Sequence, residues 1–217
     1  MTEDQIGIDL PRAEIIRNPY LIKRENELTW PEGTGSSIRL ACVGRLFLLD
    51  KGQDIALRVL ASEKWRERDL SLTFFGDGIN RDGLESLSRR LKLANIKFAG
   101  QTQDIDGIWN SHHALIMPSR GEGLPLSLVE AMLSGRIAIA TDVGGNSEVI
   151  EDNVTGFIAA TASVSDFDEA MERAWARRSD WPQMGRLAGQ RIRDLVPENP
   201  VEIFANKLID IAAGTNQ

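Results

Sequence analysis

This chain of 217 residues contains only one cysteine and two histidines. With Cys42 alone, no internal disulfide and no thiolate metal cluster can form, and its place in the apolar run IRLACVG favours a small buried side chain. The chain also lacks the apolar stretch of about 18 residues that would be needed to span a bilayer. The N-terminus MTEDQIGIDL does not have the basic-then-apolar layout of a signal peptide. These absences predict a soluble cytoplasmic protein, with peripheral contact at the inner face of the membrane left open.

Positive charge is also in short supply. The 25 Lys and Arg residues are outnumbered by 32 Asp and Glu residues, which gives a formal net charge of −7. Proteins that bind a phosphate backbone gather Lys and Arg, so we do not expect nucleic-acid binding. A hydrophobic content of 42% with 26% charged residues is ordinary for a globular protein and argues against a disordered chain or a fibre. The length allows one domain with a sizeable core, plus appendages.

Short apolar runs alternate with helical patterns between residues 37 and 180. The runs are IRLACVG, LSLTFFGDG, IKFAG, HALIMPS, RIAIATDVGG and TGFIAA. This alternation predicts βαβ units with right-handed crossovers, and continuous apolar segments such as ALIM and IAIA predict strands buried on both faces. We therefore expect an α/β fold with a doubly wound parallel sheet of about six strands.

The two ends of the chain have a different character. Residues 1–36 carry turn signals such as NPY and WPEGTGSS and no helical or strand period, which is typical of an arm or linker. Residues 181–217 contain two helical patterns without a strand partner, WPQMGRLAGQRIRDLV and PVEIFANKLIDIAA. The predicted organisation is an arm over 1–36, a sheet domain over 37–180, and C-terminal helices over 181–217 that pack on it.

The first loop with unusual chemistry is VGRLFLLDKG. In open parallel sheets, ligands bind beyond the carboxyl ends of the strands, where such loops lead into helices. Arg45 follows a predicted strand directly, and Lys51 stands at the threshold of the next helix. Two cations beside a helix N-terminus suit a diphosphate. The alternative is a pair of solvated surface charges, which is the usual fate of Arg and Lys.

The second loop, FFGDGINRDG, contains two glycines after a strand. Gly76 and Gly78 begin like a dinucleotide fingerprint, but Arg81 stands where the third glycine of G-x-G-x-x-G belongs. NAD binding is therefore a poor interpretation of this loop. The glycines still permit close backbone approach, and Asp77 can form an Asx-type turn.

The third segment is PSRGEGLPLSLVEAMLSGR, from Pro118 to Arg136. Pro125 suits the first helical position, which would place free N–H groups near residues 123–127. At 100° per residue, apolar side chains cover most of this helix, and Ser127, Glu130 and Ser134 fall on one narrow strip. A thin polar strip on a buried helix is typical of the wall of a cleft.

Two acids, Glu122 and Glu130, flank the start of that helix. A helical rise of about 1.5 Å per residue predicts backbones roughly 10 Å apart. A retaining glycosidase places its carboxyl groups only about 5 Å apart, so a hydrolytic pair is not expected. The spacing fits a ligand lying across the helix start. The alternative is that Glu122 caps the helix dipole and Glu130 pairs with a structural arginine.

The remaining polar motifs favour structural roles as much as chemical ones. In TDVGGNSEVI, two glycines permit a tight turn and Asn146 or Ser147 can cap a short helix, so structural and ligand-facing roles both stay open. D-x-D pairs occur at 104–106 and 166–168, each at a predicted helix start where Asp is a favoured cap, and we expect no metal at either. His112 and His113 lie between a helix and a strand, and we expect both to be structural.

In combination these segments resemble the C-terminal, donor-binding domain of a GT-B glycosyltransferase of the large retaining family 4, glycosyl transferase group 1. The resemblance covers roughly residues 38–160. The matching motifs, in the family's order, are VGRLFLLDKG, FFGDG, FAGQTQDIDGIW, MPSRGEGLPLSLVEAM, ATDVGGNSEVI and NVTGFI. It implies a Rossmann-like fold and an enzyme, of the hexosyltransferase type, that transfers a sugar from a nucleoside-diphosphate sugar to an acceptor with retention.

The resemblance also implies roles for individual residues. Arg45 and Lys51 would hold the donor diphosphate and stabilise its departure, Glu122 would contact sugar hydroxyls, and Glu130 would contact the ribose. Backbone N–H groups after Glu122 would face sugar and phosphate, and segment 98–101 would offer main-chain contacts to the base. The implied donor-binding set is Gly44, Gly76, Asp77, Gly78, Phe98, Gln101, Gly123, Leu124, Pro125, Leu126, Ser127 and Glu130. A UDP-sugar is the commonest donor in the family, and neither a metal nor another cofactor is implied.

The sequence departs from the family pattern in three ways. Leu124-Pro125 replaces the frequent Phe-Gly, so one backbone donor is lost at Pro125. His113 stands where Asp is common in the strand before Pro-Ser. These 217 residues do not include a match to the family's N-terminal acceptor domain, although IRNPYLI resembles the interdomain segment. We therefore expect a partner domain or separate subunit, and little or no activity of the chain alone. A noncatalytic nucleotide-sugar-binding module and a sugar-nucleotide epimerase are the alternatives.

Overall fold

The computed structural model describes residues 28–31 and 37–213. Contacts divide the chain into two compact units, one of Tyr20–Leu195 and one that combines Met1–Pro19 with Val196–Gln217. The larger unit contains the sheet, and the described part of the smaller unit contains helix α11 (Pro200–Ala212). In the ranges that the structure describes, no helix is both long enough and apolar enough to cross a membrane.

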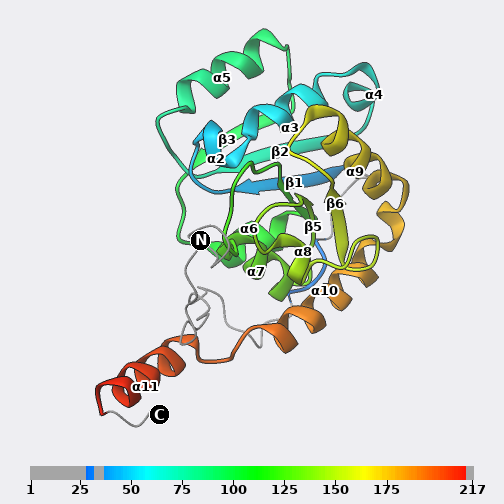
Figure 1. Ribbon diagram of the computed structural model, residues 1–217. Coiled ribbons are helices and arrows are strands. Elements are labelled where there is room, and N and C mark those ends of the chain that lie inside the picture. Colours follow the sequence, from blue (N-terminus) through cyan, green and yellow to red (C-terminus); the bar gives the residue numbers. More distant parts are fainter. Residues whose placement is uncertain (1–27, 32–36, 214–217) are drawn as a thin grey trace. The chain divides into compact units, whose positions relative to one another are not determined.

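The larger unit is built on one parallel sheet of six strands in the order β3-β2-β1-β4-β5-β6 (Figure 1). The strands are β1 (Ile38–Val43), β2 (Leu70–Phe75), β3 (Ile96–Gly100), β4 (Ala114–Met117), β5 (Ile137–Thr141) and β6 (Gly156–Ala159). All the predicted strands and the α/β fold class are confirmed. This order is that of a Rossmann-like sheet, and its direction of winding reverses between β1 and β4, where such folds bind ligands.

Burial explains why these strands were recognisable. Every residue of β4 and β5 is buried, because helices cover both faces of the central strands. Strand β2 alternates instead, with Leu70, Leu72 and Phe74 buried and the residues between them partly exposed. Strand β3, at one edge of the sheet, has no fully buried residue. The burial of strand residues therefore falls from the centre of the sheet toward β3.

Helices form a layer on each face of the sheet. The layer on one face contains α3 (Gln53–Leu60), α5 (Arg81–Arg90) and α9 (Val164–Ala176), and the other contains α6 (Ile105–Ser111), α7 (Leu126–Leu133) and α10 (Trp181–Leu195) (Figure 1). Phe157 and Phe167 are fully buried between α9 and the sheet. Burying side chains of this size stabilises the fold by about 1.5 to 3 kcal/mol each.

Two helical features could not be read from the sequence pattern. Residues 53–65 (QDIALRVLASEKW) have one amphipathic pattern, but α3 ends at Leu60 and a separate turn, α4 (Glu63–Arg66), follows. The Ser62 hydroxyl donates to Val59 O at 3.0 Å, which competes with continuation of the helix. The loop after β1 contains an unexpected one-turn helix, α2 (Leu48–Lys51).

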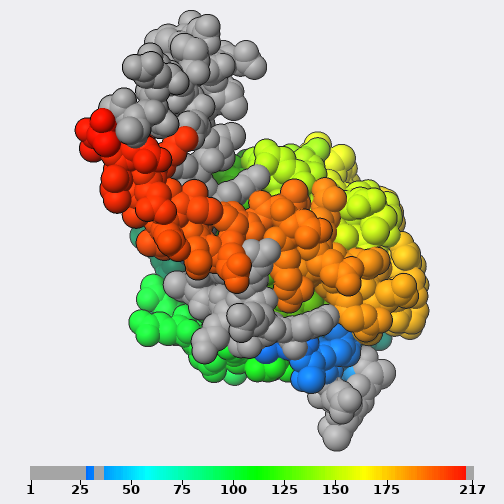
Figure 2. All heavy atoms as spheres, turned by 90° about the horizontal axis from the view of Figure 1, so that it is seen from below, coloured from blue at the N-terminus to red at the C-terminus, as the bar shows by residue number. Residues whose placement is uncertain are grey.

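Helix α10 belongs to the larger unit. It packs against α7, β5 and β6, and its Gly185 approaches Gly135 so closely that an added Cβ would lie 2.0 Å from Gly135 O. Arg191 donates from Nε to Val149 O at 2.7 Å. The orange spheres of α10 adjoin yellow-green spheres of earlier segments (Figure 2). Contacts thus group α10 with the sheet and divide the chain after Leu195. The predicted domain boundaries stay predictions. Packing of α11 on the sheet domain stays a prediction.

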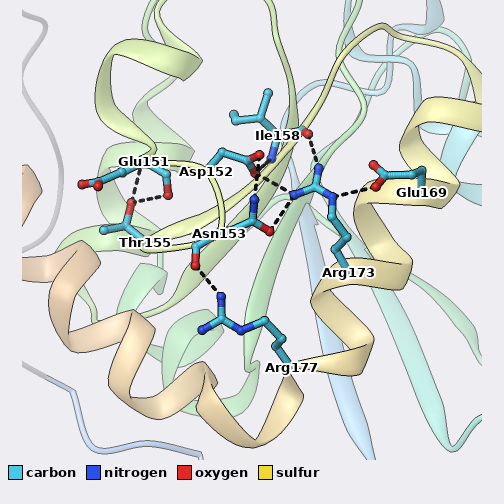
Figure 3. Close-up of polar contacts among 8 residues, drawn as sticks. All are labelled: Glu151, Asp152, Asn153, Thr155, Ile158, Glu169, Arg173 and Arg177. Carbon is cyan, nitrogen blue, oxygen red and sulfur yellow. Dashed lines mark hydrogen bonds and ion pairs between the residues drawn. The ribbon is translucent and has the colours of Figure 1, made fainter.

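The motif NVTGFI forms a turn at the amino end of β6. Asn153 has a left-handed backbone (φ 63°), and Arg173 of α9 donates to its Oδ1 and to Asp152 Oδ1, both at 2.9 Å (Figure 3). The same guanidinium donates to Ile158 O at 2.6 Å. All six parallel strands begin at the same end of the sheet and finish at the other. This network therefore lies at the amino ends of the strands, opposite the carboxyl ends where the ligand site is predicted. Its role is to hold β6 on α9.

Buried Arg136 anchors residues 28–31 at the same amino edge. Only 1% of its surface is exposed, and its guanidinium donates to Trp109 O at 2.6 Å, to Ser134 O at 2.8 Å and to Thr29 O at 2.7 Å. Trp30 lies against this guanidinium, with 5.4 Å between Cζ and the ring centroid. Burial lowers the pKa of Arg136 to about 10, so it remains a cation at neutral pH. Residues 28–31, expected to belong to a linker, therefore take part in the packing of the sheet domain.

His113 completes this anchor. Its Nδ1 accepts from Arg39 N at 2.9 Å, so the neutral ring carries its proton on Nε2, which lies 3.2 Å from Pro31 O. The ring also packs against Trp30, with centroids 5.6 Å apart. Burial, reinforced by the charge of Arg39, lowers the pKa of His113 to about 4. Burial likewise lowers the pKa of His112, and both histidines are structural as expected.

We expect acid to destabilise the domain through His113. An unfolded histidine titrates near pH 6.5, so between pH 6.5 and about 4 only the unfolded chain takes up this proton. The resulting loss of stability is absent above pH 6.5 and grows to about 3 kcal/mol as the pH falls to 4. Imidazole NMR titration measures this directly, since the chain has two histidines and His112→Asn assigns the remaining signal. A midpoint near 6.5 for His113 would contradict the expectation.

Candidate functional site

Three loops meet beyond the carboxyl ends of β1, β4 and β5. Gly52 has a left-handed backbone (φ 60°), and a Cβ on it would lie 2.0 Å from Pro118 O. Gly144 (φ 56°) approaches Glu122 in the same way, with 2.2 Å from an added Cβ to Glu122 O. Gly145 N donates to Gly123 O at 2.7 Å. The predicted freedom of Gly144 and Gly145 to turn tightly is thus used to pack one loop on another.

Lys51 and Glu122 form an ion pair where the first two loops touch. Lys51 Nζ lies 2.7 Å from both Glu122 carboxylate oxygens, and Ser119 Oγ donates to Oε1 at 2.7 Å. The Lys51 side chain is 26% exposed and that of Glu122 only 6%. The structure therefore brings together two of the three residues predicted to be catalytic. The partners of the Glu122 carboxylate are the side chains of Lys51 and Ser119. The alternative was that Glu122 only caps the dipole of the following helix.

Arg45, the third predicted catalytic residue, lies apart from this ion pair. Its side chain is 64% exposed, 3.4 Å from Asp50 Oδ2, and its guanidinium lies 4.9 Å from the centre of the Phe47 ring. Its backbone is fixed, because Gln53 Nε2 donates to Arg45 O at 2.8 Å. Convergence of Arg45 with Lys51 on one ligand stays a prediction.

Helix α7 begins one residue later than predicted. Pro125 is its N-cap, with extended backbone angles (φ −70°, ψ 132°), and the first helical residue is Leu126. The fixed φ of proline suits either position, so the sequence could not decide between them. Leu128 N donates to Pro125 O at 3.1 Å, and the N–H groups of Leu126 and Ser127 precede this first helical bond. They are the amide donors that the helix start offers to an anion.

Glu130 lies farther along α7 and is 4% exposed. Leu124 to Ser127 are partly exposed and Gly123 is exposed, whereas α7 is buried from Leu128 on. The start of the helix is thus open to solvent and its later turns are not. Contact of Glu130 with a ribose stays a prediction.

The glycine-rich loop after β2 borders a second hollow. A cavity of about 220 Å³ is lined by Val43, Gly44, Phe75, Gly76, Gln101 and Thr102, together with two isoleucines of α6. An added Cβ on Gly76 would lie 2.1 Å from Gly44 O, and one on Gly78 would lie 2.4 Å from Leu46 O. Both glycines are therefore needed for packing. Asp77 Oδ1 accepts from Gly78 N at 2.8 Å, which holds the turn.

The side chain of Phe98 takes part in packing. It stacks on Phe74, with ring centroids 5.0 Å apart, beneath the loop that leads to Gln101. Its carbonyl accepts from Arg81 Nη2 at 3.4 Å. The structure thus brings Gly44, Gly76 and Gln101 to one cavity, whereas the partly buried Phe98 ring packs against the core.

Three of the four D-x-D carboxylates have partners within the protein. Asp104 caps α6 as expected, accepting from Gly107 N at 2.8 Å. Asp166 was expected to cap α9, but Ser163 occupies that position and accepts from Asp166 N at 3.1 Å. Asp168 instead pairs with Lys64 at 2.7 Å. In the described part of the chain no three His, Cys, Asp or Glu residues are grouped so that they could hold a metal ion.

Sequence reasoning missed two residues of the site. Ser119 positions Glu122, and its own carbonyl accepts from Thr141 Oγ1 at 2.6 Å. Arg120 bonds the loop that carries Lys51. The Pro-Ser-Arg triplet before Glu122 was the available signal, but only the folded chain shows what these side chains contact.

Comparison with known proteins connects this site to a family. The description "Glycosyl transferases group 1" belongs to a family model that matches residues 37–177, well over half of the chain. The chain belongs to this family. The match contains every predicted catalytic and donor-binding residue.

Individual relatives are distant. An uncharacterized glycosyltransferase of Haemophilus influenzae is 26% identical over 159 residues, which cover 72% of this chain and 44% of that protein. Staphylococcus aureus TarM, in a crystal structure with fondaparinux, alpha-GlcNAc-glycerol and UDP, superposes with a TM-score of 0.77 at 21% identity, covering 93% of this chain and 40% of that one. The C-terminal domain of LpcC, a glycosyl transferase group 1 family protein of Francisella tularensis, gives a TM-score of 0.63 at 18% identity, covering 71% of this chain and 84% of that one.

These structures share the GT-B-type Rossmann-like fold of the present chain. The chain spans less than half the length of the curated relatives that it matches.

Proposed function

We propose that this chain is the donor-binding domain of a retaining glycosyltransferase that uses a nucleoside-diphosphate sugar. The observation that carries the proposal is the contact of Lys51 with Glu122 beside the start of α7. A cation, exposed helix amides and a carboxylate then lie within one site. The cation and amides suit a diphosphate, and the carboxylate suits hydroxyl groups of the attached sugar.

The donor would lie across the carboxyl edge of the sheet. Lys51 and the N–H groups of Leu126 and Ser127 bind the diphosphate, and Glu122 accepts from sugar hydroxyls. The cavity beside Gln101 takes the base, and Glu130 takes the ribose. The presence of UDP in the TarM structure favours uracil as that base. Each assignment combines the role that the family resemblance implies for a residue with the position of that residue in the structure.

The catalytic task assigned to this domain is to stabilise the departing nucleoside diphosphate. Lys51, joined by Arg45 once its guanidinium turns inward, supplies positive charge, and the helix start supplies preoriented amides. Such groups stabilise developing charge without reorganising and without a metal. A separate domain or subunit would hold the acceptor, so transfer by this chain alone should be weak.

Calorimetry tests the proposal. We expect UDP, or else GDP or ADP, to bind the purified chain, and NAD not to bind. NAD binding, or no binding by any of the three nucleoside diphosphates, would reject the proposal. An assay for UDP release from UDP-glucose then separates a catalytic domain from a noncatalytic binding module.

A further inference from the structure

Helix α2, which carries Lys51, is too short to be stable alone. It has four residues, whereas isolated helices shorter than about 12 residues are marginal in water. The last carbonyl groups of any helix lack partners within the helix. In α2 these include the carbonyl of Asp50, whereas Leu48 O accepts one bond from the C-cap, Gly52 N, at 3.3 Å. The position of Lys51 therefore depends on what else binds these two carbonyls.

Arg120, from the loop after β4, binds both carbonyls. Its Nη1 donates to Leu48 O at 2.7 Å, and its backbone N–H donates to Asp50 O at 2.6 Å. Gly121 N adds a bond to Asp50 O at 3.2 Å. A guanidinium at the carboxyl end of a helix also interacts favourably with the helix dipole.

Arg120 is itself held by Asp54 at the start of α3. The two side chains form a fork, with Nη1 2.9 Å from Oδ1 and Nη2 3.2 Å from Oδ2. Bidentate pairs of this kind restrict the guanidinium more than a single contact does. The Asp54 side chain is 18% exposed and that of Arg120 is 36% exposed, so solvent competes only in part.

The backbone around α2 is shaped for this contact. A Cβ on Gly52 would lie 3.3 Å from Arg120 Nη1 as well as 2.0 Å from Pro118 O. Gly52 directly follows Lys51, and Glu122 lies two residues after Arg120. The two partners of the ion pair are thus each next to the point where α2 is fastened.

We propose that Arg120 is a positioning residue that fastens α2 to the loop 118–121 and thereby aims Lys51 at its ligand. The identity of the ligand as a nucleoside diphosphate rests on the function proposed above. The fastening of α2 does not rest on that function, because the bonds that create it are present in the chain itself.

Nucleotide affinity provides the first test. UDP, with GDP and ADP as further probes, is titrated by calorimetry into the wild type and the variant Arg120→Ala. If only about a tenth of the molecules keep Lys51 in place, the affinity falls about tenfold. Arg58→Ala is the matched control, because Arg58 lies 3.8 Å from the same Asp54 and is on α3, and it should bind as the wild type does.

A double-mutant cycle separates positioning from general destabilisation. In a Lys51→Ala background, Arg120→Ala should weaken binding less than about twofold, because the residue that it positions has gone. An equal tenfold loss in both backgrounds would overturn the proposal. Arg120→Lys should be intermediate, since an ammonium keeps the positive charge but lacks the planar fork that bonds the two Asp54 oxygens through two nitrogens. Asp54→Asn serves as the second variant if Arg120→Ala does not fold.

Amide exchange tests the fastening without any ligand. Lys51 N donates to Phe47 O at 2.8 Å and Gly52 N to Leu48 O at 3.3 Å. Both amides should exchange at least about tenfold faster in Arg120→Ala than in Arg58→Ala, as local opening becomes easier. Unchanged exchange would overturn the proposal. Faster exchange in a protein whose wild type binds none of the three nucleotides would support the role of Arg120 and reject the proposed function.

Discussion

Replacement of Lys51 by alanine should weaken binding of UDP, or of whichever of GDP and ADP binds, by about 100-fold, since truncating one partner of a buried charged contact costs about 2 to 5 kcal/mol. Two effects combine. The diphosphate loses its direct contact with a cation. In addition, the negative charge of Glu122, whose side chain is only 6% exposed, is no longer compensated and repels the diphosphate. Calorimetry on the purified variant measures the loss.

Glu122→Gln provides the comparison that distinguishes these effects. The glutamine keeps the size of the side chain and can still accept from Ser119 Oγ, but it no longer repels phosphate. A nucleoside diphosphate without a sugar should therefore bind Glu122→Gln at least as tightly as the wild type. Lys51→Ala combined with Glu122→Gln should recover part of the affinity lost in Lys51→Ala. Wild-type affinity in Lys51→Ala would show that the diphosphate does not lie at this ion pair.

Arg136→Met should lower the free energy of unfolding by about 3 to 5 kcal/mol, a large effect for one substitution. Methionine preserves much of the apolar volume but donates no hydrogen bond. The carbonyls of Trp109, Ser134 and Thr29 would lose their guanidinium partner. Trp109 and Ser134 are buried, and each buried group left unsatisfied costs about 1 to 3 kcal/mol. Water reaching part of the opened space keeps the total below the sum of these losses.

Urea denaturation of Arg136→Met beside Arg186→Met measures this effect. Both arginines line a cavity of about 280 Å³ with residues 28–30, but Arg186 is exposed. We expect Arg186→Met to lower the free energy of unfolding by less than about 0.5 kcal/mol, because the residue is exposed. Equal effects would show that the carbonyl contacts of Arg136 do not stabilise the fold.

The strands were predictable because central parallel strands are apolar on both faces, as in ALIM and IAIA. Helix α2 was not, because its one turn is stabilised from outside by Arg120 and has no pattern of its own. The break at Ser62 depends on one hydroxyl competing with the helix, and the start of α7 on a proline that suits two positions. Local signals therefore predicted the elements but not all of their ends.

The site was predictable in residue types more than in contacts. Lys51 and Glu122 were both expected near a diphosphate, but they lie 71 positions apart, and nothing in the sequence indicates that each is the other's partner. Arg45 resembles Lys51 in charge, yet it lies on Phe47 beside Asp50. Which cation enters a cleft depends on side-chain packing, which the sequence does not display.

The anchoring of residues 28–31 also sets a limit on shortening this domain. The match to the family model begins at residue 37, yet Trp30 and Pro31 already pack on His113, and Thr29 accepts from Arg136. A fragment that begins at residue 37 would remove hydrogen-bond and packing partners of both Arg136 and His113. A stable fragment of this domain should therefore begin before residue 28, upstream of the start of the family match.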